Sequence, residues 1–453
     1  MDSSRGRCKA KAMRFAITTL GCKVNQYDSA MIEARLGAAG LQRCDFDQVA
    51  DVYVVNTCTV TDRADAESLK LARRARRLNP HARVIMTGCL AQANPSTLAA
   101  APEVDQVIGL TRIDDLVRAA AGQDTTRVMV SNLRKGRAAI DAAAVVPAGQ
   151  TRAFLKLQEG CDQFCSFCIV PFSRGASRSV PPRRVLEVLD ALHDQGFKEV
   201  ILSGVHLGGY GKDLSPPVTL MALLEMIAER CSIPRVRLSS IDPEELSDGI
   251  IDLVAGADKF CPHFHLPLQA GDDRILERMR RRYHTVDYRE RVERILARMP
   301  EAAIGTDLIV GFPGETAEHF ERYFAFIQSL PLAYFHVFPY SVRSGTTAAR
   351  LGGKVDAREI KVRAVRLREL GEQRRLAFVR RFVGTRLKVL IEETREPGCQ
   401  RLRGYSRNYI KVLIQGADEL KNHELDVEAS AVDGVALVGR VGQPQATAGG
   451  SRG

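Results

Sequence analysis

Three cysteines stand close together near the middle of the chain. Cys161, Cys165 and Cys168 lie in the segment EGCDQFCSFCIVPFSRG, and no fourth cysteine is near them. A tetrahedral metal site needs four ligands, and structural zinc sites usually pair two Cys-x-x-Cys knuckles. The chain contains no second knuckle of this kind. The spacing therefore predicts a metal centre with one ligand still to be found, and a zinc site completed by a distant histidine is one interpretation.

The cysteine loop resembles a known signature. It follows the expected strand AFLKLQ (153–158), and its Cys-x-x-x-Cys-x-x-Cys spacing is similar to that of the radical S-adenosylmethionine (SAM) enzymes. Loops of that type hold a 4Fe–4S cluster by their thiolates. In those enzymes the amino and carboxylate groups of SAM bind the fourth iron. The resemblance therefore implies that the missing ligand is the substrate SAM.

Three more cysteines occupy matching places in the first part of the chain. Cys22, Cys58 and Cys89 each follow directly after an expected strand. In a parallel sheet these strand ends share one edge, where binding sites usually lie. Three converging thiolates can hold a second iron–sulfur cluster with an open iron. Buried, inert cysteines are the alternative, which the repeated position makes the weaker interpretation.

Five further residues are candidates for contacts with SAM. An aromatic ring beside the third cysteine can lie on the adenine, and glycines after a barrel strand let the backbone approach a ligand. The C-terminal ends of barrel strands are where ligands bind. The candidates are Phe167, Gly204, Ser239, Gln269 and Asp307, with Ser240 and His265 at comparable strand ends. Each of them, taken alone, is also compatible with a structural role.

Composition restricts the class of protein. The chain has 453 residues, enough for several domains at about 150 residues each. Its eleven cysteines are an odd number and follow no export signal, which favours metal or catalytic use over disulfides. No window approaches the ~20 apolar residues of a membrane span, and the first residues contain no secretory apolar region. We therefore expect a cytoplasmic protein with no membrane association.

Charge points to the kind of partner. The formal net charge is +11, which favours a polyanion, and RNA is the first candidate. Three basic stretches offer phosphate contacts: KLARRARR (70–77), RMRRR (278–282) and REIKVRAVRLREL (358–370). Solvated helix faces that bind nothing are the alternative interpretation of such stretches.

The expected elements place these residues on three folded parts. Short apolar runs at 14–21, 51–58 and 83–89 alternate with helical patterns at 27–40 and 64–78, which predicts a parallel α/β sheet. Six further strand–helix units follow from Arg152 and predict a partial (β/α)6 barrel rather than a complete one of eight. Residues 356–381 are expected to form a basic helix. After Phe382, short strands at 385–393, 408–414 and 434–441 predict a small β-barrel.

These patterns give an α/β fold class with defined domain bounds. We expect an N-terminal parallel α/β domain at 13–121 and a linker at 122–150. The partial barrel is expected at 151–381 and the small C-terminal barrel at 382–445.

The six cysteines and this domain order together resemble one family over nearly the whole chain, the radical SAM methylthiotransferases. The resemblance implies a TRAM-type C-terminal barrel and two 4Fe–4S clusters. It assigns Cys22, Cys58 and Cys89 to one cluster and the loop cysteines to the other. It also implies the chemistry: one SAM methylates a sulfur on the first cluster, and a second SAM yields a 5′-deoxyadenosyl radical that opens a C–H bond for the methylthio group. An electron donor protein and a sulfur source, which the sequence does not identify, are implied as partners.

Members of the family differ in their substrates. The segments LGCKVNQYDS, IVPFSRGASRS, GVHLGGYG and PLQAGDDRILERMRRRY are most similar to the branch that modifies threonylcarbamoyl-adenosine, immediately 3′ of the tRNA anticodon. Isopentenyl-adenosine in tRNA and an aspartate of a small-subunit ribosomal protein are the substrates of the other branches. An RNA-binding protein with purely structural metal sites is the alternative from another class.

Two expectations concern substrate binding. The carboxylate of a threonylcarbamoyl group needs a cationic partner, and Arg174, Arg178 and Arg343 are the candidates, although each is also compatible with an ordinary surface arginine. The C-terminal segment RLRGYSRNYIKV carries Tyr405 and Tyr409 between basic residues. Aromatic rings among cations are typical of surfaces that stack RNA bases.

Overall fold

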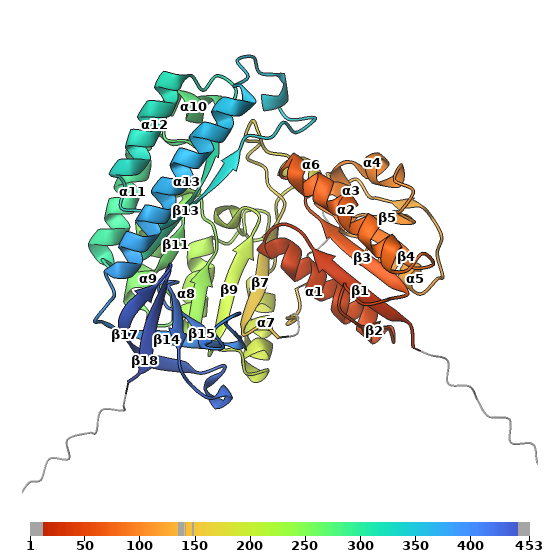
Figure 1. Cartoon of the computed structure of the whole chain (residues 1–453), viewed down its shortest axis with the longest axis horizontal. Helices are drawn as coiled ribbons and strands as arrows, with labels where there is room; N and C mark the ends of the chain where they lie inside the picture. The colour runs from red at the N-terminus through yellow and green to blue at the C-terminus, as the bar shows by residue number, and fades with distance from the viewer. Residues whose placement is uncertain (1–11, 135–139, 141, 147–148, 443–453) are drawn as a thin grey trace, which may run out of the picture. The chain divides into compact units, whose positions relative to one another are not determined.

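A computed structural model of the chain describes residues 12–134, 140, 142–146 and 149–442 (Figure 1). The chain forms two compact units. The first unit combines Met1–Pro147 with Glu159–Arg178 and Ser341–Arg350, and the second contains the remainder. The cysteine loop at 161–168 therefore belongs to the same unit as the N-terminal cysteines. The domain bounds expected from the sequence stay predictions, because these units are assembled from separate chain segments.

The first unit is built on one parallel sheet. Its strands are β1 (Arg14–Thr19), β2 (Gln42–Arg43), β3 (Val52–Thr57), β4 (Arg83–Gly88), β5 (Gln106–Ile108) and β6 (Val128–Met129), in the spatial order β2-β1-β3-β4-β5-β6. Its helices are α1 (Lys23–Ala38), α2 (Asp62–Leu78), α3 (Cys89–Ala93), α4 (Pro95–Ala99), α5 (Ile113–Ala120) and α6 (Val170–Ser173). The expected strands and the two expected helices are all present. The stretch expected as a linker, 122–150, contributes the edge strand β6.

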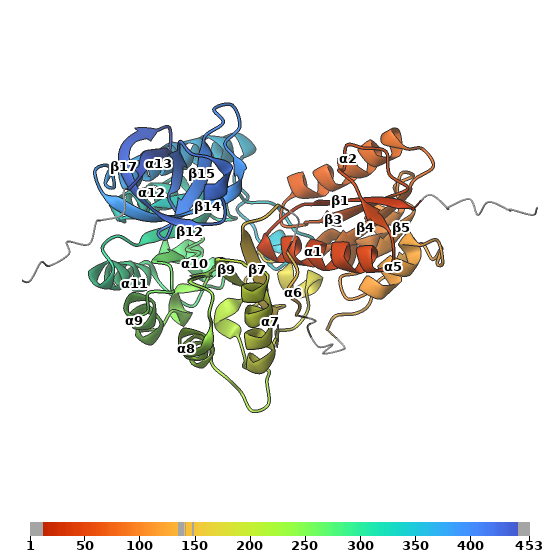
Figure 2. The same cartoon turned by 90° about the horizontal axis from the view of Figure 1, so that it is seen from below.

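Helices cover both faces of this sheet. Figure 2 shows α2 on one face and α1 with α5 on the other. Every residue of β3 is buried, as expected for the centre of a covered parallel sheet. Tyr53 and Val55 pack in one core cluster with Ala72 of α2, whereas Val54 packs in another with Leu36 of α1. The two layers hold the strand ends, and therefore the residues after them, in fixed positions.

The second unit contains six parallel barrel strands. They are β7 (Arg152–Glu159), β9 (Glu199–Gly204), β10 (Arg235–Leu238), β11 (His263–His265), β12 (Ala303–Val310) and β13 (Tyr334–Pro339). Neighbours pair in this order, with β10 and β11 joined by single bridges such as Ser240 to His265. Within the described residues β13 does not pair with β7, so the barrel is partial, as predicted. The two-residue strand β8 (Arg178–Ser179) borders β7.

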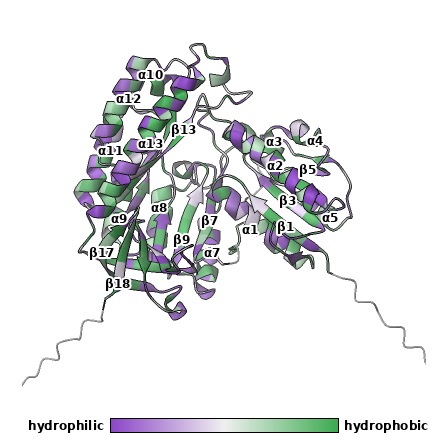
Figure 3. Cartoon of the chain, in the orientation of Figure 1, coloured by the Kyte–Doolittle hydropathy of each residue, from purple (hydrophilic) through white to green (hydrophobic). Residues whose placement is uncertain are grey.

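Helices follow the barrel strands along the chain. They are α7 (Pro182–Asp194), α8 (Leu220–Arg230), α9 (Asp248–Gly256), α10 (Asp273–Arg278), α11 (Thr285–Arg298), α12 (Ala317–Ser329) and α13 (Ala357–Arg380). Short 3-10 turns occur at Leu207–Gly209, Pro243–Glu245, Ala348–Arg350 and Asp418–Leu420. Figure 3 shows hydrophilic and hydrophobic residues alternating along α11, α12 and α13. This alternation is expected of helices that lay one face on the strands.

The C-terminal segment closes into a small barrel. Its strands are β14 (Arg386–Arg395), β15 (Leu402–Ser406), β16 (Lys411–Ile414), β17 (Glu424–Asp433) and β18 (Ala436–Val441), closed in the order β14-β15-β16-β18-β17. The sequence predicted β14, β16 and β18 but not β15 or β17. Val389, Val412 and Leu437 form its core together with Phe378 and Phe382 at the end of α13. The long helix and the small barrel therefore share one core cluster.

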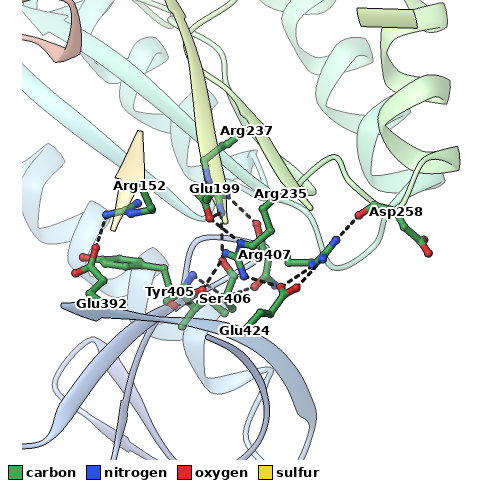
Figure 4. Close-up of polar contacts among 12 residues, drawn as sticks. Arg152, Glu199, Arg235, Arg237, Asp258, Glu392, Tyr405, Ser406, Arg407 and Glu424 are labelled. Carbon is green, nitrogen blue, oxygen red and sulfur yellow. Dashed lines mark hydrogen bonds and ion pairs between the residues drawn. The ribbon is translucent and has the colours of Figure 1, made fainter. Parts of the chain in front are cut away.

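Buried ion pairs join the small barrel to the N-terminal ends of the large barrel's strands (Figure 4). Glu199, at the start of β9, accepts hydrogen bonds from Arg235 Nε at 2.7 Å and Arg237 Nε at 2.8 Å, and none of these three side chains is exposed. Arg235 also bonds Glu424 of β17 at 2.7 Å, while Arg237 donates to the carbonyl of Arg407 at 2.8 Å. The small barrel thus provides hydrogen-bond acceptors for two buried arginines, Arg235 and Arg237, at the base of the large barrel.

Candidate functional site

The three N-terminal cysteines meet at one edge of the first sheet. Cys22 precedes α1 directly after β1, Cys58 follows β3, and Cys89 begins α3 directly after β4. The thiols of Cys22 and Cys89 lie 3.9 and 3.8 Å from the same amide oxygen, Oδ1 of Asn25. A Cβ added to Gly21 would lie 3.2 Å from the Cys58 sulfur. The convergence predicted from strand ends is confirmed.

Tight backbone turns bring these cysteines together. Gly88 has a φ of +95°, and an added Cβ would lie 2.4 Å from the carbonyl oxygen of Thr57. No side chain fits there, so glycine is required for β4 to turn directly into Cys89. The hydroxyl of Thr57 donates to the carbonyl of Thr87 at 2.6 Å and accepts from the amide of Leu90, which pins the same turn to β3.

The chemistry of this donor set fits an iron–sulfur cluster. Burial raises the pKa of Cys58 and raises that of Cys89 to about 12, so without a metal these thiols keep their protons at neutral pH. Metal binding would displace those protons and place soft thiolates around the ion. All ten described cysteines are free of disulfides, Cys399 is exposed, and Cys8 lies outside the described residues.

The second cysteine set lies on a loop shaped by its own backbone. The amide of Cys161 donates to the carbonyl of Gly175 at 3.0 Å, and that of Cys168 donates to Cys165 at 3.0 Å. Gly160 has a φ of +75°, and a Cβ there would lie 2.0 Å from the carbonyl oxygen of Ala176. All three cysteines are partly exposed. Three accessible thiols on one short loop fit a cluster that must also receive a small-molecule ligand.

Contacts within the first unit hold this loop in place. The guanidinium of Arg134 lies 4.7 Å over the ring of Phe164, which also makes an edge contact with Phe172. The amide of Ala348 donates to the carbonyl of Ser166 at 2.7 Å. Phe167, expected to lie on an adenine, is partly exposed on the loop. The loop is therefore fixed from two chain segments, one on each side of it in the sequence.

The arginines expected to meet a substrate carboxylate are not ordinary surface residues. Arg174, Arg178 and Arg343 are all buried. Arg174 pairs with Asp28 and Glu159, and Arg343 pairs with Asp62 and Asp65. Because each of these two guanidinium groups already faces two carboxylates, they are poor candidates for holding a third. Arg178 donates to the carbonyl of Arg174 at 3.3 Å.

The remaining SAM candidates lie on the barrel strands of the second unit. The amide of Gln269, at a φ of 70°, donates to the carbonyl of Asp307 at 2.8 Å. The hydroxyl of Ser239 is buried with no hydrogen-bond partner among the described residues. A Cβ on Gly204 would meet the side chain of Gln158 at 3.2 Å, so the backbone is closely approached there. Their roles stay predictions.

One polar group on these strands was only partly anticipated. His265 Nδ1 lies 2.8 Å from the hydroxyl of Ser240, and its Nε2 lies 3.3 Å from Asp307. Ligand atoms of His265, Asp307 and His336 all lie within 4.8 Å of one another. His336, which pairs with Asp307 across β12 and β13, was missed. The alternation of side chains along β13 is the sequence signal that could have identified His336.

Comparisons with known proteins place the chain in a family. Residues 14–109 match the family model described as "Uncharacterized protein family UPF0004", and residues 155–327 match that of the "Radical SAM superfamily". The threonylcarbamoyladenosine tRNA methylthiotransferase MtaB of Bacillus subtilis is 38% identical over 89% of this chain and 91% of its own length. The chain belongs to the radical SAM methylthiotransferases. Enzymes of this family use SAM and carry 4Fe–4S clusters, so the two cysteine sets of this methylthiotransferase fit its family's cofactors.

Two further similar proteins are a relative with a different named substrate and a solved structure with a similar fold. The tRNA-2-methylthio-N(6)-dimethylallyladenosine synthase of Methylobacillus flagellatus is 33% identical over 91% of this methylthiotransferase and 96% of its own length. The radical SAM methyltransferase TsrM from Kitasatospora setae, solved with cobalamin and a [4Fe-4S] cluster, has a TM-score of 0.54 at 15% identity. It covers 75% of this chain and 77% of its own, and this likeness concerns the fold alone.

Among the described helices, none is both long enough and apolar enough to cross a bilayer.

Proposed function

We propose that this enzyme inserts a methylthio group into threonylcarbamoyl-adenosine, immediately 3′ of the anticodon in tRNA. The observation that carries the proposal is the order of the relatives. Four threonylcarbamoyladenosine tRNA methylthiotransferases are 34–38% identical to the chain. Four dimethylallyladenosine synthases are 29–33% identical. Segments quoted from both units of the chain favour the same branch.

The six cysteines have separate tasks in this proposal. Cys22, Cys58 and Cys89 would hold one 4Fe–4S cluster, and Cys161, Cys165 and Cys168 would hold the other together with SAM. When bound, these groups supply the methylthio sulfur and the means of opening an unreactive C–H bond. The chain itself binds and orients them: the sheet edge buries Cys58 and Cys89, and the loop after β7 leaves its three thiols accessible. Burial of Cys58 and Cys89 also keeps water away from those two sulfur atoms, whereas Cys22 is exposed.

Contacts with tRNA are expected on α13 rather than on α2. Along α2, four of the six basic side chains have acidic partners, as in Arg74 with Asp47 and Arg76 with Asp105. On α13, by contrast, Arg358, Lys361 and Arg375 are exposed and have no ion-pair partner among the described residues. Uncommitted cations on one long helix are suited to phosphates.

The two tyrosines expected to stack RNA bases have neighbours within the second unit. Tyr405 lies 4.5 Å from the guanidinium of Arg152, and Tyr409 lies 4.8 Å from that of Arg237. Tyr409 also packs against His263, with ring centroids 4.8 Å apart. These rings contact the base of the large barrel within the same unit, and stacking on RNA bases stays a prediction.

Other partners follow from the proposed reaction. The proposed reaction needs an electron donor protein and a source of sulfur. A cytoplasmic location stays a prediction.

The substrate is tested with purified holoenzyme and two matched tRNAs. One tRNA carries threonylcarbamoyl-adenosine and the other carries isopentenyl-adenosine at the same position, and nucleosides are analysed by mass spectrometry. A site built to hydrogen-bond a polar group rejects an analogue without it by large factors. We therefore expect the methylthio product only from the first tRNA. Equal turnover of both, or activity confined to a ribosomal protein, would refute the substrate assignment.

A further inference from the structure

Arg174 occupies an unusual position in the first unit. Its side chain is 2% exposed, although it carries a full charge and follows the cysteine loop by only a few residues. Its Nη2 donates to Asp28 at 2.9 Å and to Oδ1 of Asn25 at 2.5 Å, and its Nη1 pairs with Glu159. A buried guanidinium with three side-chain partners from two distant segments is a specific arrangement.

Asn25 connects this arginine to the N-terminal cysteines. Its amide nitrogen donates to the carbonyls of Leu20 at 2.7 Å and Thr57 at 3.0 Å, which fixes its orientation. Its oxygen therefore points to Arg174, and the thiols of Cys22 and Cys89 approach that same oxygen. The path from Arg174 to two proposed cluster ligands passes through one rigid side chain.

The partners of Arg174 also span both cysteine sets. Asp28 and Asn25 lie on α1, the helix that begins directly after Cys22. Glu159 is the last residue of β7, two residues before Cys161. The guanidinium therefore ties the segment that carries one proposed cluster to the segment that carries the other. Replacing either carboxylate or the arginine would loosen that tie.

We propose that Arg174 is a positioning residue that holds the two cysteine sets in register and sets the electrostatic potential at the N-terminal set. The inference rests on the proposed function only in taking each cysteine set to bind a cluster. Asn25, Asp28 and Glu159 transmit the effect, and none of them is a cluster ligand.

Electrostatics supports a role beyond packing. Arg174 is paired with two carboxylates, Asp28 and Glu159, and a guanidinium stays charged in a protein, so the positive charge persists although the side chain is only 2% exposed. Replacing a buried ion pair with apolar residues is often neutral for stability. Because stability alone does not require this buried charge, we expect it to act on the cluster bound by the neighbouring thiols. Outer-shell partners of metal ligands tune both affinity and reduction potential.

The experiment uses the full-length, iron-loaded chain without any tRNA. Arg174→Gln removes the positive charge, Asp28→Asn removes a negative charge, and Arg174→Lys keeps the charge. Arg363→Gln is the matched control, because Arg363 is also buried and pairs with Glu315 at 2.7 Å in the second unit, far along the chain from the cysteines. Iron per chain, the reduction potential of each cluster by spectroscopic titration, and Tm are measured for each protein.

The two charge changes should act in opposite directions. Arg174→Gln should lower the reduction potential of the cluster on Cys22, Cys58 and Cys89, since less positive charge favours the oxidised form. Asp28→Asn should raise it. Iron affinity of that site should fall by about 10–100-fold in Arg174→Gln, and Arg174→Lys should recover part of both properties. Arg363→Gln should lower Tm and leave both potentials unchanged.

Unchanged potentials in Arg174→Gln and Asp28→Asn would overturn the inference, as would an equal shift in Arg363→Gln. If Arg174→Gln does not fold, the inference is still tested by the other two variants. Asp28→Asn should raise the reduction potential of the N-terminal cluster, and Arg174→Lys should stay close to the wild type. With tRNA added, Arg174→Gln should release 5′-deoxyadenosine while the methylthio product per deoxyadenosine falls by about 10–100-fold. Failure of the wild-type enzyme to modify threonylcarbamoyl-adenosine would refute the proposed substrate instead, because the potentials are measured without tRNA.

Discussion

Two buried arginine centres in this molecule use the same chemistry in different places. In the first unit, Arg174 faces Asp28 and Glu159 beside three thiols at the C-terminal ends of strands. In the second unit, Arg235 and Arg237 share Glu199 at the N-terminal ends of strands, under the small barrel. Parallel strands present ligands at their C-terminal ends, whereas their N-terminal ends serve stability. The position along the strand, more than the residue types, distinguishes a centre that tunes chemistry from one that joins folded parts.

The largest contrast should come from the cysteines beside the first centre. Cys168→Ala removes a ligand of the proposed SAM-binding cluster, so we expect no 5′-deoxyadenosine from the purified variant. Cys89→Ala should still release 5′-deoxyadenosine but form no methylthio product. Both products are measured by mass spectrometry from the same reaction. A folded Cys89→Ala protein without any SAM cleavage would contradict the division of labour between the two sets.

The second centre should respond through stability instead. Glu199→Gln leaves two buried guanidinium groups without their shared carboxylate, which should lower the free energy of unfolding by about 3–5 kcal/mol. Stability is measured by denaturant unfolding, and the iron content and the reduction potentials of both clusters are measured on the same protein. We expect the potentials to match those of the wild type. A changed potential with unchanged stability would reverse the roles given to the two centres.

The pH dependence of stability should also reflect the ion pairs of Glu199 with Arg235 and Arg237. Burial alone would raise the pKa of Glu199, but the charges of Arg237 and Arg235 lower it to about 2 from an ordinary 4.5. A carboxyl with a lowered folded-state pKa stabilises the fold above its unfolded pKa, and this contribution is lost as the pH falls. The free energy of unfolding of the iron-free protein should therefore drop between about pH 4.5 and pH 2. The Glu199→Gln protein should show a shallower slope over that window, and parallel slopes would contradict the assignment.

The smallest effect concerns the surface, away from both centres. Lys361→Ala on α13 should weaken tRNA binding and make the slope of log affinity against log salt shallower by about one unit, because one cation that neutralises a phosphate is removed. Arg366→Ala is the matched control, because Arg366 lies on the same helix as Lys361 but already pairs with Glu321 of α12 at 2.5 Å. A salt titration of tRNA affinity distinguishes the two variants. Identical slopes for both would remove α13 from the RNA surface.

The sequence predicted the cysteine sites better than their surroundings. Cys22, Cys58 and Cys89 could be placed because each follows an apolar strand, and the edge of a parallel sheet brings such positions together. Arg174 could not be placed, because its partners lie up to 149 residues away and no local pattern links them. The same limit applies to Tyr409, whose neighbours on β10 and β11 decide whether its ring is free.

The elements follow a similar rule. Strongly apolar strands such as β3 and β4 were predicted closely from their short runs of apolar residues. The strands β2, β5 and β6 are two or three residues long, too short to show a period. β15 and β17 carry polar and charged residues on their outer face, and only closure of the small barrel makes them strands.

The composition of the first unit from three chain segments has a consequence for biosynthesis. Arg343 reaches Asp65 across 278 residues of sequence, and the segment Ser341–Arg350 belongs to the unit that begins at the N-terminus. Translation delivers the N-terminal sheet long before these closing contacts exist, and contacts of such separation form late. The cysteines of the N-terminal sheet, Cys22, Cys58 and Cys89, are therefore synthesised well before the segment that completes their unit.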